Sequence, residues 1–136
     1  MKDYFEWDSS YSVHIEELDM QHQKLIQMIN QFHESIQHSI DNNSIKSIIL
    51  NMKQYALIHF DREETYMKKY EYPGIADHVA VHEKFLKKIE EVEQKIKIEN
   101  HNIAVEIVEY LKHWLNDHIL IEDKQYADYY KKNKLL

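Results

Sequence analysis

The sequence predicts an all-α fold: an up-down-up-down antiparallel four-helix bundle with an N-terminal aromatic arm. Three observations lead to this prediction. Glycine and proline occur once each, 43% of the residues are hydrophobic, and apolar residues recur at helical spacing in four long segments. So few turn residues leave no room for the many tight turns of an all-β fold. At 136 residues, we expect a single domain with a sizeable buried core.

The four helices are expected at about residues 15–40, 45–70, 75–98 and 103–130. The polar stretch 41–44 ends the first helix and supplies capping residues for the second, and residues 72–74 (Tyr-Pro-Gly) break the chain before the third. Residues 100–102 (Asn-His-Asn) form the last turn. Short connections between long helices favour antiparallel neighbours. Residues 1–14 are expected to form an arm packed across the bundle because they carry four aromatic side chains: Tyr4, Phe5, Trp7 and Tyr11.

Composition argues against several classes of function. The net charge is −7, and basic residues are interspersed with acidic ones, whereas a nucleic-acid-binding protein concentrates positive charge on one face. No apolar run reaches membrane-spanning length and no signal peptide is recognisable, so we expect a cytoplasmic protein that engages no membrane. Cysteine is absent, which excludes disulfides and thiol chemistry. We expect a monomer.

Ten histidines occur in the chain, and the positions of several of them predict a metal site. Six metal-ligating side chains interrupt the apolar stripes of the four helices: His22, His59, Glu63, His78, His82 and His118. A single buried histidine is more often a hydrogen-bonded core residue, and a single pair with i,i+4 spacing is a weak signal. Buried imidazoles and carboxylates are costly unless they are paired or bind metal. A set drawn from all four helices therefore predicts a shared metal centre.

The motifs around these residues resemble the hemerythrin family over essentially the whole chain, and the arm resembles that of its bacterial single-domain members. The motifs that carry the resemblance are Asp19–His22, His59-x-x-x-Glu63, His78-x-x-x-His82 and Trp114-Leu115-x-x-His118-Ile119-x-x-x-Asp123. The resemblance implies a non-heme centre of two iron ions, with seven ligands: His22, His59, Glu63, His78, His82, His118 and Asp123.

By the same resemblance, one iron is held by three histidines and the other by two. The first set is His78, His82 and His118, and the second is His22 and His59. Glu63, Asp123 and a solvent-derived oxo or hydroxo group bridge the two ions. The second iron would keep an open position, where a small ligand binds. The identity of the metal stays open, because histidine-rich sites also bind zinc, manganese or cobalt.

Helical spacing disagrees with the resemblance at one position. Asp123 lies five residues after His118, which is about 140° around a regular helix, whereas Glu122 at i+4 faces the site better. Spacing alone selects Glu122, and only the resemblance selects Asp123. We therefore predict a local irregularity around residues 119–122, such as a π-bulge, because these recur at functional sites.

Reversible dioxygen binding for storage, transport or delivery is the predicted function, rather than enzymatic turnover. Five neutral imidazoles and two carboxylates should disfavour the highly oxidised iron that carboxylate-rich centres stabilise. Four apolar side chains flank the ligand positions and are expected to line a dry oxygen pocket: Leu25, Ile26, Leu115 and Ile119. The alternatives are an oxygen or redox sensor and a di-iron enzyme of peroxidase or nitric oxide reductase type. The expected partner is an oxygen-consuming enzyme or a signalling protein.

Overall fold

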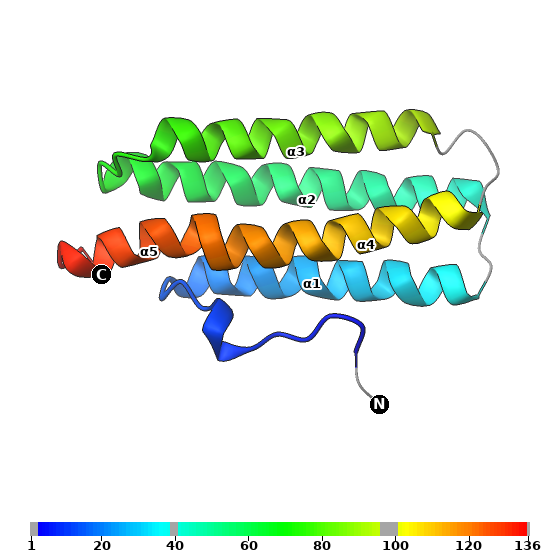
Figure 1. The fold of residues 1–136 in the computed structure, drawn as a ribbon, viewed down its shortest axis with the longest axis horizontal. Coiled ribbons are helices and arrows are strands. Elements are labelled where there is room, and N and C mark those ends of the chain that lie inside the picture. The colour runs from blue at the N-terminus through cyan, green and yellow to red at the C-terminus, as the bar shows by residue number, and fades with distance from the viewer. Residues whose placement is uncertain (1–2, 39–40, 96–100, 136) are drawn as a thin grey trace.

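The computed structural model describes residues 3–38, 41–95 and 101–135, and four antiparallel helical rods dominate it (Figure 1). The helices are α1 (Glu16–Gln37), α2 (Asn42–Lys69), α3 (Ile75–Lys95), α4 (His101–Asp117) and α5 (Lys124–Lys132). A π-helical segment, η2 (His118–Asp123), joins α4 to α5, so these three elements form the fourth rod. The predicted up-down-up-down bundle is confirmed. No described helix has the length and apolar character needed to span a bilayer.

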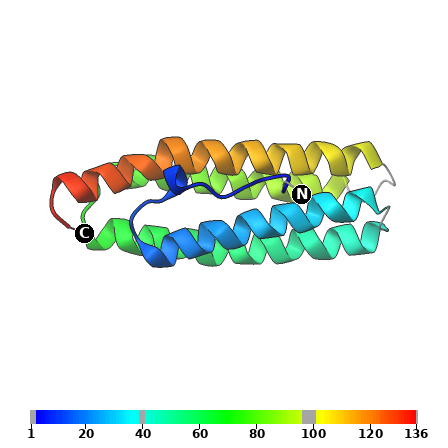
Figure 2. The ribbon, with the colours of Figure 1, turned by 90° about the horizontal axis from the view of Figure 1, so that it is seen from below.

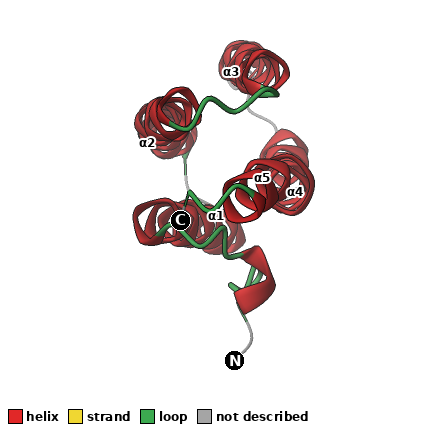
Figure 3. Ribbon diagram, turned by 90° about the vertical axis from the view of Figure 1, so that its left-hand side faces the viewer, coloured by secondary structure: helices red, strands yellow, loops and turns green. Residues whose placement is uncertain are grey.

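The end-on view places the four rods at the corners of a quadrilateral (Figure 3). The close backbone contacts join α1 to α2, α2 to α3 and α1 to α4, whereas α3 and α4 approach each other less closely. The pairs α1–α3 and α2–α4 are therefore diagonal, and every rod turns one face toward the shared interior.

Local chemistry explains where the helices begin and end. The carboxylate of Asp41 accepts a hydrogen bond from the Ser44 N–H at 2.8 Å and caps the start of α2. Between α2 and α3, Glu71 adopts a φ of 53°, and a Cβ on Gly74 would lie 2.8 Å from the ring of Tyr72, so a side chain at position 74 would displace that ring. The fourth rod begins at His101, two residues earlier than predicted. The remaining part of that predicted turn, Asn100, lies outside the described residues.

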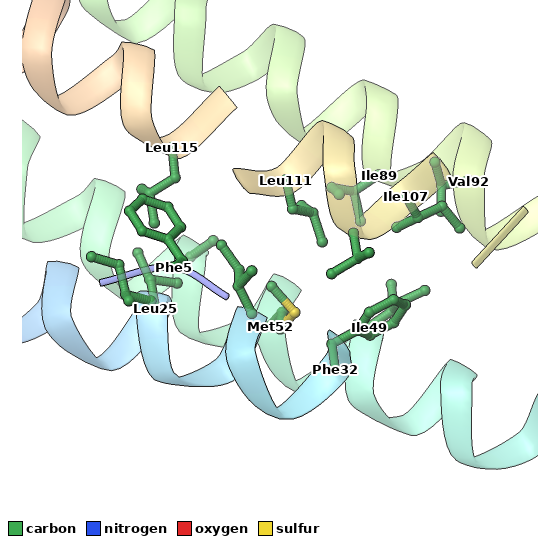
Figure 4. Close-up of a cluster of buried hydrophobic side chains, with 14 of the residues drawn as sticks. Phe5, Leu25, Phe32, Ile49, Met52, Ile89, Val92, Ile107, Leu111 and Leu115 are labelled. Atoms are coloured by element: carbon green, nitrogen blue, oxygen red, sulfur yellow. The ribbon is translucent and has the colours of Figure 1, made fainter. Parts of the chain in front are cut away.

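The buried apolar side chains form two clusters along the bundle axis. The larger one, which we call the apolar layer, includes Phe32, Ile49 and Leu111, and Figure 4 shows its side chains pointing inward from all four rods. The smaller one, the tyrosine cluster, lies at the other end around Met67, Tyr126 and Tyr130. On each rod, the ligand-type residues predicted from the sequence stand between the residues of these two clusters.

The N-terminal segment packs across the bundle as predicted and bridges two helices (Figure 2). The N–H of Phe5 donates to Oδ1 of Asn30 on α1, and Nδ2 of Asn30 donates back to the Phe5 carbonyl, both at 2.8 Å. The hydroxyl of Tyr11 donates to Oδ1 of Asn116 on α4 at 2.6 Å. The arm ends at His14, whose φ of 63° redirects the chain into α1.

Candidate metal centre

Seven ligand-type side chains meet in the interior between the two apolar clusters. They are His22 from α1, His59 and Glu63 from α2, His78 and His82 from α3, and His118 and Asp123 from η2. None is more than 4% exposed. They form two groups that share Glu63, and within each group the ligand atoms lie within 4.8 Å of one another. One group adds His78, His82 and His118 to Glu63, and the other adds His22, His59 and Asp123.

The two carboxylates each face both groups. Glu63 places Oε1 2.8 Å from Nε2 of His59 and Oε2 3.7 Å from Nε2 of His78. Asp123 places Oδ2 3.0 Å from Nε2 of His22 and Oδ1 3.1 Å from Nε2 of both His78 and His118. Oε1 of Glu63 also lies 3.6 Å from Nε2 of His82, so the carboxylates of both Glu63 and Asp123 face histidines of the two groups and are positioned to bridge two cations.

The predicted helix irregularity is confirmed, and it explains how Asp123 reaches the interior. Residues 118–123 form one π-helical segment, whose wider turn brings residue i+5 back toward the face of residue i. As a result His118, Ile119 and Asp123 are buried, whereas Ile121 is 57% exposed. Glu122, the residue that regular spacing selects, lies in neither ligand group and has its Oε2 3.9 Å from the outer nitrogen, Nδ1, of His118.

Two polar residues that the sequence analysis did not single out orient the imidazoles. Nδ1 of His59 donates to Oε1 of Gln21 at 2.7 Å, and Nδ1 of His82 lies 3.0 Å from Oε2 of Glu64. An amide or carboxylate oxygen can only accept, so Nδ1 carries the proton and the Nε2 lone pair faces the site. The sequence offered one indication of these two residues, their position next to candidate ligands: Gln21 precedes one and Glu64 follows another.

Aromatic rings fix two of the imidazole planes. Phe60 stacks on His82 with ring centroids 3.8 Å apart and an interplanar angle of 8°. Trp114 stacks on His118 at 4.5 Å and 16°. In the sequence Trp114 is only one residue of a motif, whereas in the structure its ring holds that of a candidate ligand.

The electrostatics of the site favour three neutral imidazoles and one charged one beside a pair of carboxylates. Burial lowers the pKa of His22, His59 and His118, which keeps them in the form that binds metal. Burial and repulsion by Glu63 raise the pKa of Asp123 to about 6. Although burial opposes it, interaction with Asp123 and Glu63 raises the pKa of His78 to about 10. The two buried carboxylates therefore attract positive charge.

The donor set fits two metal ions. Among the described residues, several buried ligand atoms have no hydrogen-bond partner: Nε2 of His22, His59 and His78, and both carboxylate oxygens of Glu63 and Asp123. Leaving so many buried polar atoms unsatisfied is costly. Cations between the two groups would satisfy all of them, and imidazole with carboxylate is a donor set suited to first-row transition metals.

An apolar cavity of about 30 Å³ adjoins this centre within the apolar layer. Two of the four residues predicted to line an oxygen pocket, Leu25 and Leu115, line the cavity together with Phe60 and Trp114. The other two, Ile26 and Ile119, are buried in the same cluster but do not line the cavity. The cavity thus reaches the two aromatic rings that stack on His82 and His118.

Comparisons with known proteins agree with this geometry. The family described as "Hemerythrin HHE cation binding domain" matches residues 13–130. The chain is 30% identical to a bacteriohemerythrin of Clostridium acetobutylicum, over 91% of this chain and 99% of the relative. It is 32% identical to a bacteriohemerythrin of Stenotrophomonas maltophilia, over 92% of this chain and 80% of the relative.

Solved structures show the same fold. Wild-type hemerythrin superposes with a TM-score of 0.80 at 24% identity, covering 92% of this chain and 96% of the solved one. A point mutant of hemerythrin gives a TM-score of 0.81 at 23% identity. With a family match that spans most of its length, the chain belongs to the hemerythrin family.

Proposed function

We propose that this protein binds dioxygen reversibly at two iron ions, for oxygen storage, transport or delivery. His78, His82 and His118 would hold one ion, His22 and His59 the other, and Glu63 and Asp123 would bridge them. The observation that carries this proposal is the pair of buried ligand groups that share a carboxylate. When bound, the iron pair supplies the electrons that dioxygen accepts on binding and returns on release.

The two sides of the site differ by one imidazole. Three histidines contribute to one group and two to the other, so the chain leaves the side of His22 and His59 one ligand short. A missing protein ligand is the usual mark of a position kept for a small molecule. This asymmetry supports dioxygen binding on that side.

The surroundings of the site favour a small apolar ligand. The adjoining cavity of about 30 Å³ exceeds the space of about 10–15 Å³ that one water needs, and its lining is almost entirely apolar. Dioxygen can occupy such a space without losing hydrogen bonds, whereas water cannot. Excluding water also protects a bound ligand from protonation and loss.

A di-iron enzyme of peroxidase or nitric oxide reductase type is the second candidate, and Tyr126 is the observation that favours it. Its hydroxyl is buried without a hydrogen-bond partner in the described part of the chain, and its ring centroid is 5.5 Å from that of His78. A phenol so placed can give an electron and a proton to an oxidant. Steady turnover with hydrogen peroxide or nitric oxide, lost in Tyr126→Phe, would favour the enzyme over the carrier.

The test of the proposed function is the absorption spectrum of the reduced protein under alternating oxygen and nitrogen. We expect a visible band that develops under oxygen and fades under nitrogen over repeated cycles, with two irons per chain by metal analysis. The variant His22→Leu should lose the band while keeping its helical circular dichroism. A single irreversible oxidation, with no band that fades, would contradict reversible binding. An oxygen or redox sensor would show the same band, so the sensing role is distinguished by a partner that binds only one of the two states.

A further inference from the structure

A surface groove runs between α3 and α4, the neighbouring helices that approach each other least closely. It encloses about 660 Å³, and the residues that matter here are Lys84, Lys87, Lys88, Glu91, Trp114 and Glu122. The groove lies on the outside of the candidate metal centre, because Trp114 and Glu122 in its lining both face His118 and Lys84 is exposed to solvent. None of these groove residues belongs to either ligand group.

Trp114 connects this groove to the centre. Its side chain is partly exposed and lines the groove, while its ring stacks on His118 at 4.5 Å. In the described part of the chain, the other aromatic side chains in close contact with candidate ligands are Phe60 and Tyr126, and both are buried. Trp114 is thus the described ring that contacts a ligand imidazole on one side and the solvent on the other.

The charge of the groove is opposite to that of the whole chain, which carries −7. Lys84 and Lys87 are exposed, and none of the three groove lysines has a carboxylate within 4.0 Å among the described residues. Of the two acidic groove residues, Glu122 turns inward, with a buried Oε2 that faces His118. The lysines therefore set the charge that an approaching molecule meets, with Glu91 the remaining opposing group.

We propose that this groove is an electron-input site, where an anionic one-electron donor docks and reduces the iron pair through Trp114 and His118. This inference rests on the proposed iron centre, because an oxygen carrier works only while its iron is ferrous. Each donor loses one electron, and two such transfers convert two ferric ions to two ferrous ions, with no bond of the chain formed or broken. A stacked aromatic contact shortens the distance over which the electron must tunnel.

Charge reversal tests the docking step. The ferric protein is mixed under nitrogen with dithionite, which reacts as the sulfur dioxide radical anion, or with reduced methyl viologen, a radical cation. Lys84→Glu changes the local charge by two units, so at low salt we expect the anion to react roughly threefold more slowly and the cation roughly threefold faster. A merely structural effect would move both rates in the same direction.

Lys24→Glu is the matched control, because Lys24 follows His22 by two residues, as Lys84 follows His82, but lies on the diagonal helix α1. It should leave the ratio of the two rates nearly unchanged, and 0.5 M salt should abolish the difference in Lys84→Glu. The proposal is overturned if both rates in Lys84→Glu change together or not at all, or if Lys24→Glu shifts the ratio equally.

Substitution of Trp114 tests whether the electron passes through this residue to the iron pair. Trp114→Leu should slow reduction by both reagents severalfold, and Trp114→Phe, which can still stack on His118, should recover most of the rate. Unchanged rates in Trp114→Leu would overturn the route.

The groove can also be tested without iron chemistry. The chain has two tryptophans, so in a Trp7→Phe background the fluorescence reports Trp114 alone. With redox-inert Zn²⁺ in the site, and with each ion scaled to its quenching of free N-acetyltryptophanamide, iodide should quench this fluorescence more strongly than caesium, and Lys84→Glu should reverse the order. Equal quenching by both ions would refute a cationic groove at Trp114. That result would leave reversible oxygen binding, tested by its own spectrum, unaffected.

Discussion

The apolar layer and the metal centre are neighbouring segments, or slices, along the axis of the same four-helix bundle. They differ in the chemistry of their interior side chains and in their backbone geometry. In the apolar layer, Phe32, Ile49 and Leu111 interdigitate on regular α-helices. In the metal centre, the same interior positions carry imidazoles and carboxylates with unsatisfied atoms, and the fourth rod departs from α-helical geometry. The contrast indicates that the apolar layer supplies the stability of the bundle, and that the buried polar side chains of the candidate metal centre depend on this stability.

The sharpest test of this contrast compares substitutions at two adjacent carboxylates in η2, made one at a time. Asp123→Asn removes the negative charge of a carboxylate whose oxygens face histidines of both ligand groups, and we expect it to abolish binding of at least one metal ion per chain. Glu122→Gln changes the neighbouring residue outside both groups and should lower metal affinity by no more than about tenfold. Metal content after dialysis against a weak chelator measures both. Equal loss in the two variants would show that the π-helical segment does not select Asp123.

A cavity in the apolar layer should have the complementary effect. Leu111→Ala removes a buried side chain and should lower the free energy of unfolding by about 3 kcal/mol, as large-to-small core substitutions do. The metal content at room temperature should stay unchanged, because the two ligand groups keep all of their members in this variant. Urea unfolding followed by circular dichroism measures the change. Leu57→Ala, at an exposed leucine of α2, is the control and should change the stability by less than about 0.5 kcal/mol.

The apolar layer and the metal centre also differ in how many of their residues could be predicted from the sequence. Periodicity identified the four rods and their interior faces, because regular packing repeats at 3.6 residues and each position reinforces the next. It also located the five histidines and Glu63, since ligand-type residues on an apolar stripe stand out. Asp123 could not be found by spacing, because the π-helical turn breaks the periodicity on which spacing arguments rest.

Contacts between helices were the other feature of the site that could not be predicted from the sequence. Gln21 and Glu64 orient ligand imidazoles, yet each stands beside a ligand position on the face that turns to a neighbouring helix. Nothing in a one-dimensional pattern shows which side chain a residue meets across that boundary. The same holds for Trp114, whose contact with His118 depends on the rotamers of both rings.

Acid should weaken the metal centre and leave the apolar layer untouched. Burial lowers the pKa of His22, His59 and His118 from 6.5, so the unfolded chain takes up protons first as the pH falls. Stability present above pH 6.5 is therefore lost as the pH falls through the lowered values. Two groups oppose this trend, Asp123 with its pKa raised to about 6 and His78 with its pKa raised to about 10, but the three imidazoles outnumber them. We expect the Tm of the metal-free protein to fall between pH 7 and pH 5. The variant Leu111→Ala should start lower and fall in parallel, and a steeper fall in that variant would contradict the separation of the two slices.

The smallest effect is expected at the arm, which lies outside both slices but is anchored to the apolar layer by Phe5. Asn30 makes two hydrogen bonds to the Phe5 backbone, and Asn30→Ala removes both, so the stability should fall by about 1–2 kcal/mol. Because the arm contacts α1 and α4 on their outer side, metal content should not change. Limited proteolysis should cut residues 3–11 faster in this variant, while Ser10→Ala, at an exposed position of the arm, should be cut like the wild type. If Asn30→Ala also lost metal, the arm would have to be counted among the elements that hold the centre together.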